Sequence, residues 1–266
     1  MRVSMNSKST FFLSMQKKAL DLLLMNIGTI GILLIWWIVA QLELINPVLL
    51  PGPLATLKTL VTSIFQGNLA ADFGFTLYRT LYSFGIAVVV GVPLGVVIGA
   101  NERVYHSFEF LIDFFRSTPA TAMFPLFLVI FGIDDFSKIA VAAFAGMLVI
   151  FFNVAYGVMN AGKTRILAAK VMKAPQWRIF LDVIFFETLP QTFIGLRTAV
   201  SLTLVVIIVA EMFIGSTNGM GHRIIDAQII YDMEQMYASI IAAGLMGYLL
   251  NLAFLKTERA VVHWKS

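Results

Sequence analysis

Residues 80–101 read TLYSFGIAVVVGVPLGVVIGAN, and none of these 22 side chains carries a charge. An α-helix rises about 1.5 Å per residue, so a helix of this length measures about 33 Å. The hydrocarbon core of a bilayer is about 30 Å thick. The stretch therefore predicts a helix that crosses a membrane.

Five further stretches extend this pattern. Three of them are free of charge: 22–42, 139–162 and 235–255. Two are apolar but include charged residues: 108–131, with Glu109, Asp113 and Arg116, and 188–210, with Arg197. The whole chain of 266 residues is 59% apolar and 13% charged, whereas a soluble domain has about 25% charged residues. We therefore predict an all-α polytopic membrane protein with six transmembrane helices.

The basic residues predict the orientation of these helices. With six spans both termini lie on one side, and that side carries 13 Lys and Arg residues against 4 on the other. Because basic loops stay in the cytoplasm, we predict that both termini are cytoplasmic. The first stretch is too long for the apolar region of a signal peptide, so we expect it to remain as an anchor in the lipid bilayer. The net charge of +4 is explained by these loops and does not indicate a nucleic-acid partner.

Two connections are longer than simple turns. After the first span, apolar residues from Leu54 to Ile64 recur at helical spacing and predict a short amphipathic helix at the outer surface. The inner loop 163–187 is basic and also contains apolar side chains. Such a loop must bury its apolar face against a partner protein or against the anionic leaflet of the membrane.

Three charges at membrane depth, Arg116, Arg197 and Glu211, are candidates for a translocation path. Ionisable residues in spans usually face a water-filled cavity or a charged partner. The alternative is that they form internal ion pairs that orient the helices. The three His residues share no ligand spacing and the chain has no Cys, so we expect no metal site.

Residues 157–164, GVMNAGKT, match the phosphate-loop pattern G-x-x-x-x-G-K-T. That loop binds phosphate between a buried strand and the start of a helix. Here it falls at the end of an apolar span, where a helix presents carbonyl groups. We interpret the match as accidental, and we expect no cofactor in this chain.

Gly91, Gly95 and Gly99 recur at a spacing of four within the second span, which also contains Pro93. Glycines at this spacing allow two helices to approach closely. Packing within the chain and packing between subunits are both compatible with the pattern.

The inner loop and its surroundings resemble one family of transporters. The loop reads RILAAKVMKAPQWRIFLDV at 165–183 and continues to Leu189-Pro190 and Gly195-Leu196-Arg197, which resembles the coupling loop of ABC importer permeases. Other stretches resemble the nitrate, sulfonate and taurine branch of binding-protein-dependent ABC importers. They are Leu50–Pro53, Gly91–Gly95, Arg116–Pro119 with Pro125-Leu126, Phe131–Ile139, Ala210–Met212 and Gly219–Gly221. The resemblance covers about residues 47–255.

The resemblance implies the architecture and the partners. It implies a type I (MetI-like) permease fold in a bacterial inner membrane, with residues 1–266 as one transmembrane permease domain. A second copy of the permease, ATP-binding-cassette ATPase subunits and an extracytoplasmic substrate-binding protein would complete the importer. ATP would be hydrolysed on the ATPase subunits, so this chain would not be an enzyme. The solute would be a small organic or inorganic anion, or a heterocycle related to thiamin or flavin.

The resemblance also places the cytoplasmic coupling loop at residues 163–187. The positions that correspond to the family motif are Ala168, Ala169, Lys173, Ala174 and Pro175. Lys173 stands where the family has Gly, so either the helix continues through it or Lys173 adopts a left-handed turn. Pro175 favours a stop. The main alternative function is an ion-coupled secondary transporter, which would have inverted repeats and mid-membrane carboxylates.

Overall fold

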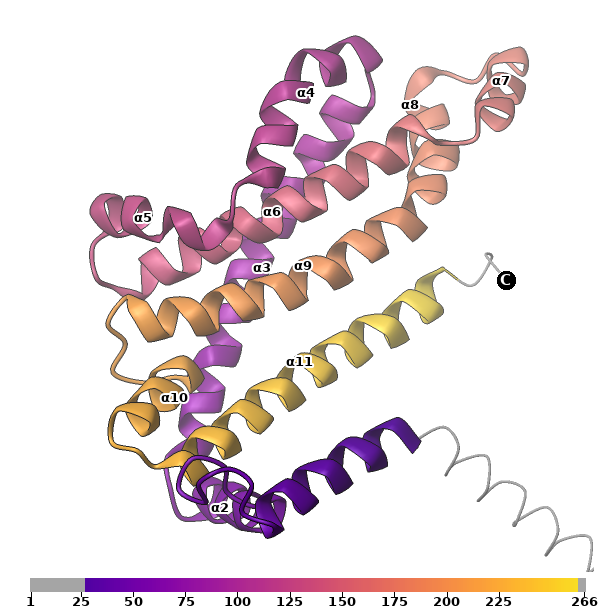
Figure 1. Ribbon diagram of the computed structural model, residues 1–266. Coiled ribbons are helices and arrows are strands. Elements are labelled where there is room, and N and C mark those ends of the chain that lie inside the picture. The colour runs from indigo at the N-terminus through magenta and orange to yellow at the C-terminus, as the bar shows by residue number, and fades with distance from the viewer. Residues whose placement is uncertain (1–26, 263–266) are drawn as a thin grey trace, which may run out of the picture. The chain divides into compact units, whose positions relative to one another are not determined.

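The computed structural model describes residues 27–262, apart from the side chains of Arg116 and Lys163. These residues are almost entirely helical (Figure 1). They form two compact units that meet between Thr59 and Leu60. Each unit is described by itself.

The described part of the first unit contains a helix, Ile27–Gln41, and the start of α2, Pro53–Phe65. The Trp36 indole donates a hydrogen bond to the carbonyl of Pro51 over 3.0 Å, which fixes the prolyl segment against this helix. The predicted first span therefore appears as a helix over its described residues, and its remaining residues, 22–26, lie outside them. The predicted short helix after the first span is present as α2, and its place at the outer surface stays a prediction.

The second unit is built on four long apolar helices: α3 Leu69–Gly99, α6 Asp135–Met159, α9 Phe185–Phe213 and α11 Met233–Val261. Each is long and apolar enough to cross a membrane, and α9 continues a helical run that begins at Gln176. They coincide with four of the six predicted spans. Helix α6 packs against both α3 and α9.

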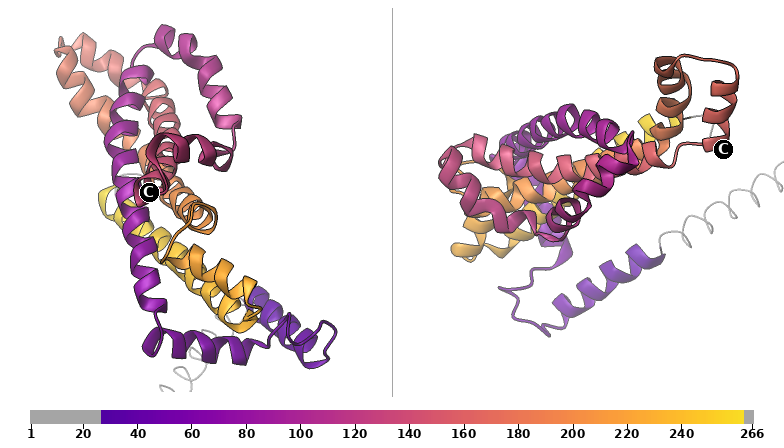
Figure 2. Two further views of the ribbon diagram at one scale, coloured as in Figure 1. Left: turned by 90° about the vertical axis from the view of Figure 1, so that its left-hand side faces the viewer. Right: turned by 90° about the horizontal axis from the view of Figure 1, so that it is seen from above.

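Shorter helices connect the long ones: α4 Glu102–Ser117, η1 Ala120–Met123, α5 Phe124–Phe131, α7 Lys163–Val171, α8 Gln176–Arg178, the π-helical turn η2 Ile179–Ile184, and α10 Met220–Ile229. Helices α7 and α10 lie at opposite ends of α6 and α9 (Figure 1). Figure 2 shows α7 and α8 as a projection beyond one end of these long helices. We refer to the two ends as the α7 end and the α10 end.

The predicted third span is broken. Helices α4 and α5 form one apolar pair, bent by 85° at the intervening residues. Thr118 is extended, with φ −82° and ψ 122°, because the following Pro119 disfavours helical geometry at the preceding residue. The described residues thus contain four long spans and this bent pair, whereas the sequence predicted six helices across the whole chain.

Helix α3 approaches α6 closely along its three regularly spaced glycines. A Cβ atom added to Gly95 would lie 2.7 Å from Cβ of Val154 and 2.8 Å from the carbonyl oxygen of Phe151. Gly91 and Gly99 are equally confined against α6, at 2.9 and 2.7 Å from backbone oxygens. The glycine pattern therefore serves packing within the chain.

Candidate functional site

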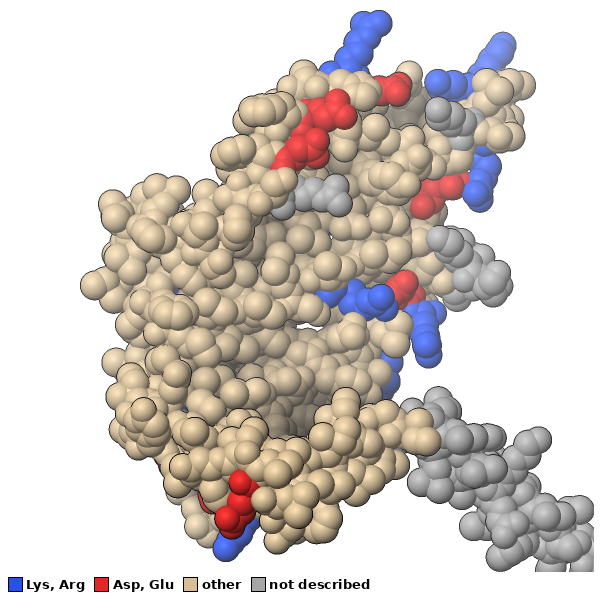
Figure 3. Space-filling model, viewed as in Figure 1, with Lys and Arg blue, Asp and Glu red and all other residues tan. Residues whose placement is uncertain are grey.

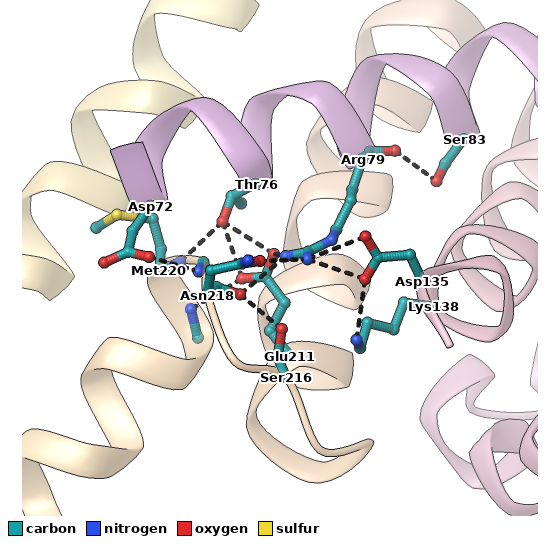
Figure 4. A network of polar contacts seen from close by, with 12 residues as sticks. Asp72, Thr76, Arg79, Ser83, Asp135, Lys138, Glu211, Ser216, Asn218 and Met220 are labelled. Atoms are coloured by element: carbon teal, nitrogen blue, oxygen red, sulfur yellow. Dashed lines mark hydrogen bonds and ion pairs between the residues drawn. The ribbon is translucent and has the colours of Figure 1, made fainter. Parts of the chain in front are cut away.

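A buried guanidinium lies at the centre of the α10 end. Arg79, on α3, is 2% exposed, and its Nη1 atom lies 2.7 Å from Oε1 of Glu211 on α9. Its Nη2 atom lies 2.9 Å from Oδ1 of Asp135, the first residue of α6. Lys138, one turn further along α6, also contacts Asp135 at 3.1 Å. Three long helices are thereby joined by one set of ion pairs (Figure 4).

The loop between α9 and α10 closes this network. The side-chain oxygen of Asn218 accepts a hydrogen bond of 2.6 Å from Nη2 of Arg79, and the Asn218 carbonyl accepts one of 3.0 Å from Nη1. Further on, the backbone amide of Gly221 donates to Glu211 over 2.9 Å. Gly219 has φ 115°, and a Cβ atom there would lie 2.5 Å from the Glu211 carboxyl group. The loop can approach the carboxylate only because this residue is glycine.

The start of α3 holds the same loop from the other side. Thr76 donates to Glu211 over 2.8 Å and accepts from the backbone amide of Met220 over 2.8 Å. Asp72 accepts from the backbone amide of Gly219 at 2.8 Å and from Nε of Arg223 at 2.6 Å. We call the residues joined by these ion pairs and hydrogen bonds the α10-end network: Asp72, Thr76, Arg79, Asp135, Lys138, Glu211, Asn218, Gly219–Gly221 and Arg223. Nearly every charged side chain in this network has an opposite charge or an amide donor as partner.

The structure places the three predicted path residues apart from one another. Glu211 is 1% exposed and lies within the α10-end network. Arg197 lies on α9, where Nη1 is 3.8 Å from Oε2 of Glu258 on α11. The backbone of Arg116 lies at the penultimate residue of α4, just before the break. Arg79 was not identified from the sequence, although Asp72, Thr76 and Arg79 stand at helical spacing just before an apolar window.

A cavity of about 630 Å³ opens between α4, α6 and α9. Its polar lining includes Asn153 of α6 and Gln191 of α9, whose side chains are joined by a hydrogen bond of 2.9 Å from Nε2 of Gln191 to Oδ1 of Asn153. Asp113 of α4 also lines it. Within residues 27–262, no group of three His, Asp or Glu side chains could hold a metal ion.

The predicted coupling loop forms a short helix with a defined end. Helix α7 stops at Val171, and Lys173 has φ 54°. The amide of Lys173 donates to the carbonyl of Lys170 at 2.9 Å, and the amide of Ala174 donates to that of Ala169 at 3.1 Å. These two bonds form a Schellman motif with Lys173 at the position where glycine is preferred. Of the two alternatives from the sequence, the left-handed turn is confirmed.

This turn leads to a prediction about Lys173. A residue with a Cβ atom costs about 1–2 kcal/mol in the left-handed region, so Lys173→Gly should stabilise the turn by about 1 kcal/mol. Lys170→Gly, inside the last turn of α7, should instead destabilise the helix by about 1 kcal/mol. Hydrogen exchange of the amides at residues 172–174 measures both effects. Faster exchange in Lys173→Gly would contradict the prediction.

The apparent phosphate loop has no strand before it. Gly157 lies inside α6, and Gly162 is the N-cap of α7. The amide of Gly162 donates to Oε2 of Glu187 at 3.2 Å, and Glu187 also pairs with Arg165. A carboxylate of the chain itself thus lies at the start of α7, where phosphate would have to bind. We still predict that the match is accidental and that these residues do not bind ATP.

Known proteins share both the sequence pattern and the fold. A protein of Brucella abortus (strain 2308), named a probable ABC transporter permease protein, is 30% identical over 218 residues, which cover 82% of this chain and 87% of that protein. The taurine transport system permease protein of Escherichia coli (strain K12) is 28% identical, with 90% and 89% covered. A nitrate import permease protein of Synechocystis is 28% identical, with 85% of each covered.

A solved structure of the MetNI methionine ABC transporter in an inward-facing conformation has the same fold. It superposes with a TM-score of 0.65 at 22% identity, and the match covers 74% of this chain and 97% of that one. The family described as binding-protein-dependent transport system inner membrane component matches residues 91–259. These matches confirm the predicted MetI-like membrane fold and the nitrate, sulfonate and taurine branch. The chain belongs to the family of binding-protein-dependent transport system inner membrane components.

Proposed function

We propose that this chain is the transmembrane subunit of an ATP-driven importer for a small solute, either an anion or a heterocycle. Two copies would enclose the path, ATPase subunits would bind the inner loops, and an extracytoplasmic binding protein would deliver the solute. ATP would bind to the partner subunits and not to this chain. Family membership supports this over an ion-coupled transporter, because relatives are named ABC permeases.

The surface of the coupling loop is the observation that carries the proposal. Several large apolar side chains on and after α7 are exposed, including Met172 at 81% and Trp177 at 60%. Ala168 is exposed and Ala169 is half-buried, so the helix has a small-residue face that another protein can approach closely. Charged side chains gather around this end, over α4 and α7 (Figure 3). An apolar and basic surface of this kind suits a docked protein better than water.

The same proposal assigns the orientation. The basic residues of the loop, the chain termini and the α3–α4 turn would place the α7 end in the cytoplasm. The α10 end would then face the binding protein. The chain would lie in the inner membrane of a bacterium.

A charge on the small face of α7 should weaken the ATPase complex. Ala168→Glu and Ala169→Glu each place a carboxylate where a partner approaches, so we expect at least tenfold weaker ATPase association and loss of uptake. Ala260→Glu, on an exposed position of α11, is the matched control and should leave association unchanged. Co-purification of the ATPase with tagged permease measures the effect. Full association in both loop variants would refute the docking site.

Arg116 remains our choice for a charge in the translocation path. Its backbone lies just before the break between α4 and α5, where helix ends leave amide groups without helical partners. Glu211 and Arg197 would support the path by holding helices, through the α10-end network and through Glu258. We expect Arg116→Gln to lower uptake severalfold at normal expression. We expect Arg116→Lys to retain uptake, because Lys keeps the positive charge, whereas a bidentate structural clamp would require Arg.

Solute uptake at matched expression measures these variants. If Arg116→Gln and Asp113→Asn each destabilise the protein and the double variant restores it, Arg116 has a structural role instead.

A further inference from the structure

The cavity between α4, α6 and α9 has the size of a small-molecule site. Its volume of about 630 Å³ lies within the range of about 300–1,000 Å³ that such sites occupy. Three helices contribute to the lining, and α4 contributes up to the break at Thr118. The chemistry of this lining indicates which solute it fits.

Asn153 is held in place from three sides. Its Nδ2 atom donates to the carbonyl of Val149 over 2.8 Å, and its Oδ1 atom accepts from Gln191. Its Cβ atom lies against Gly195, where an added Cβ atom would come within 2.6 Å of it. Asn153 therefore has a fixed position and in turn orients the amide group of Gln191.

Gln191 lines the cavity and keeps hydrogen-bonding capacity beyond its bond to Asn153. Among the described residues, its Oε1 atom and its second amide hydrogen have no hydrogen-bond partner. Asn153 lies six residues before the end of α6, at a depth of about 9 Å along the helix. A polar group at this depth costs free energy unless it is partnered. The Gln191 amide thus offers an acceptor beside a donor to whatever enters the cavity.

The remaining lining is rich in aromatic side chains. Tyr105, Phe115, Phe152 and Tyr156 contribute rings. Asp113 carries the charge among the described lining residues, and this charge is negative. Flat rings pack well against aromatic side chains.

We propose that this cavity binds a planar heteroaromatic solute that carries a hydrogen-bond donor beside an acceptor. Gln191 pairs with the polar edge of the ring, in the way that Gln and Asn pair with the edges of nucleobases. The aromatic side chains contact its faces. The proposal rests on the proposed function, and it names the heterocycle as the solute class.

Saturation-transfer NMR on the full chain in lipid nanodiscs tests this directly. The probes are cytosine, a neutral ring with an adjacent donor and acceptor, and taurine, a sulfonate. We expect transfer to the cytosine ring protons, at least a fivefold loss in Gln191→Met, and a weaker response for taurine. Gln228→Met, on an exposed position of α10, is the matched control and should behave as the unaltered chain does.

A second variant tests the same cavity if Gln191→Met does not fold. Tyr156→Leu alters an exposed ring of the same cavity, so it should lower the cytosine signal at least twofold while size-exclusion behaviour stays normal. No transfer to cytosine, equal transfer in the cavity variants, or a taurine signal that exceeds that of cytosine and depends on Gln191 would overturn the proposal. The ATPase co-purification experiment is independent, so a chain that binds cytosine but no ATPase would refute only the importer assignment.

Discussion

Arg79→Met should lower the free energy of unfolding by about 3–5 kcal/mol, because it leaves Glu211 as a buried carboxylate without a cation. The side chain of Glu211 is fully buried, and Arg79 Nη1 lies 2.7 Å from it. The same substitution also removes the donors to Asn218, so the loop between α9 and α10 loses its attachment to α3. Thermal or denaturant unfolding of the purified protein measures the loss.

A double variant separates the loss of the ion pair between Arg79 and Glu211 from the loss of side-chain packing. Arg79→Met with Glu211→Met removes both buried charges, so its cost should be clearly less than the sum of the single costs. Arg103→Met replaces an exposed arginine and should change the stability by less than about 0.5 kcal/mol. Additive costs for Arg79 and Glu211 would show that the two residues do not stabilise each other.

Gly95→Leu should destabilise the protein by about 3 kcal/mol or more. The new Cβ atom alone would overlap Val154 and the Phe151 carbonyl, and the remaining carbons have no space between α3 and α6. Overpacking of a filled interface usually costs about 1–3 kcal/mol, and here the obstacle is partly backbone, which cannot rotate away.

Gly85→Leu provides the matched control. Gly85 lies on the same helix, is exposed, and has no atom within 4 Å of an added Cβ. Leu is also the better helix former by about 1 kcal/mol, so this variant should be neutral or slightly stabilised. Unfolding in the same detergent compares the two. Equal stability of the two variants would mean that α3 and α6 do not pack along the glycines.

The sequence predicted the long helices well but misplaced their ends. The charge-free window began at Thr80, whereas α3 begins at Leu69 and includes Asp72 and Arg79. A scan for charge-free stretches stops at such residues because it cannot detect their partners. These partners, Glu211 and Arg223, lie more than 130 residues further along the chain.

The features around the cavity between α4, α6 and α9 were even harder to predict from the sequence. Pro119 disfavours helical geometry at Thr118, but the angle of 85° in the third span comes from the structure alone. Asn153 and Gln191 carry no charge, so nothing in the sequence distinguishes them from other polar residues in spans. Their relation depends on the packing of α6 against α9. Similarly, the sequence left two conformations open for Lys173. Its φ of 54° and the hydrogen bonds accepted by the carbonyls of Ala169 and Lys170 decide between them.

The α10-end network also constrains the order in which the protein can mature. Arg79 and Glu211 are 132 residues apart, and a ribosome adds about 5–20 residues per second, so Arg79 is made roughly 7–26 s before its carboxylate partner. During this interval Asp135, 56 residues after Arg79, can offer it a first counter-charge. The amides of Gly219 and Gly221 and the guanidinium of Arg223, which pairs with Asp72, are made last. Assembly of this end of the molecule is therefore a late step of biogenesis, and a chain cut short before α9 would keep a guanidinium without its main acceptor.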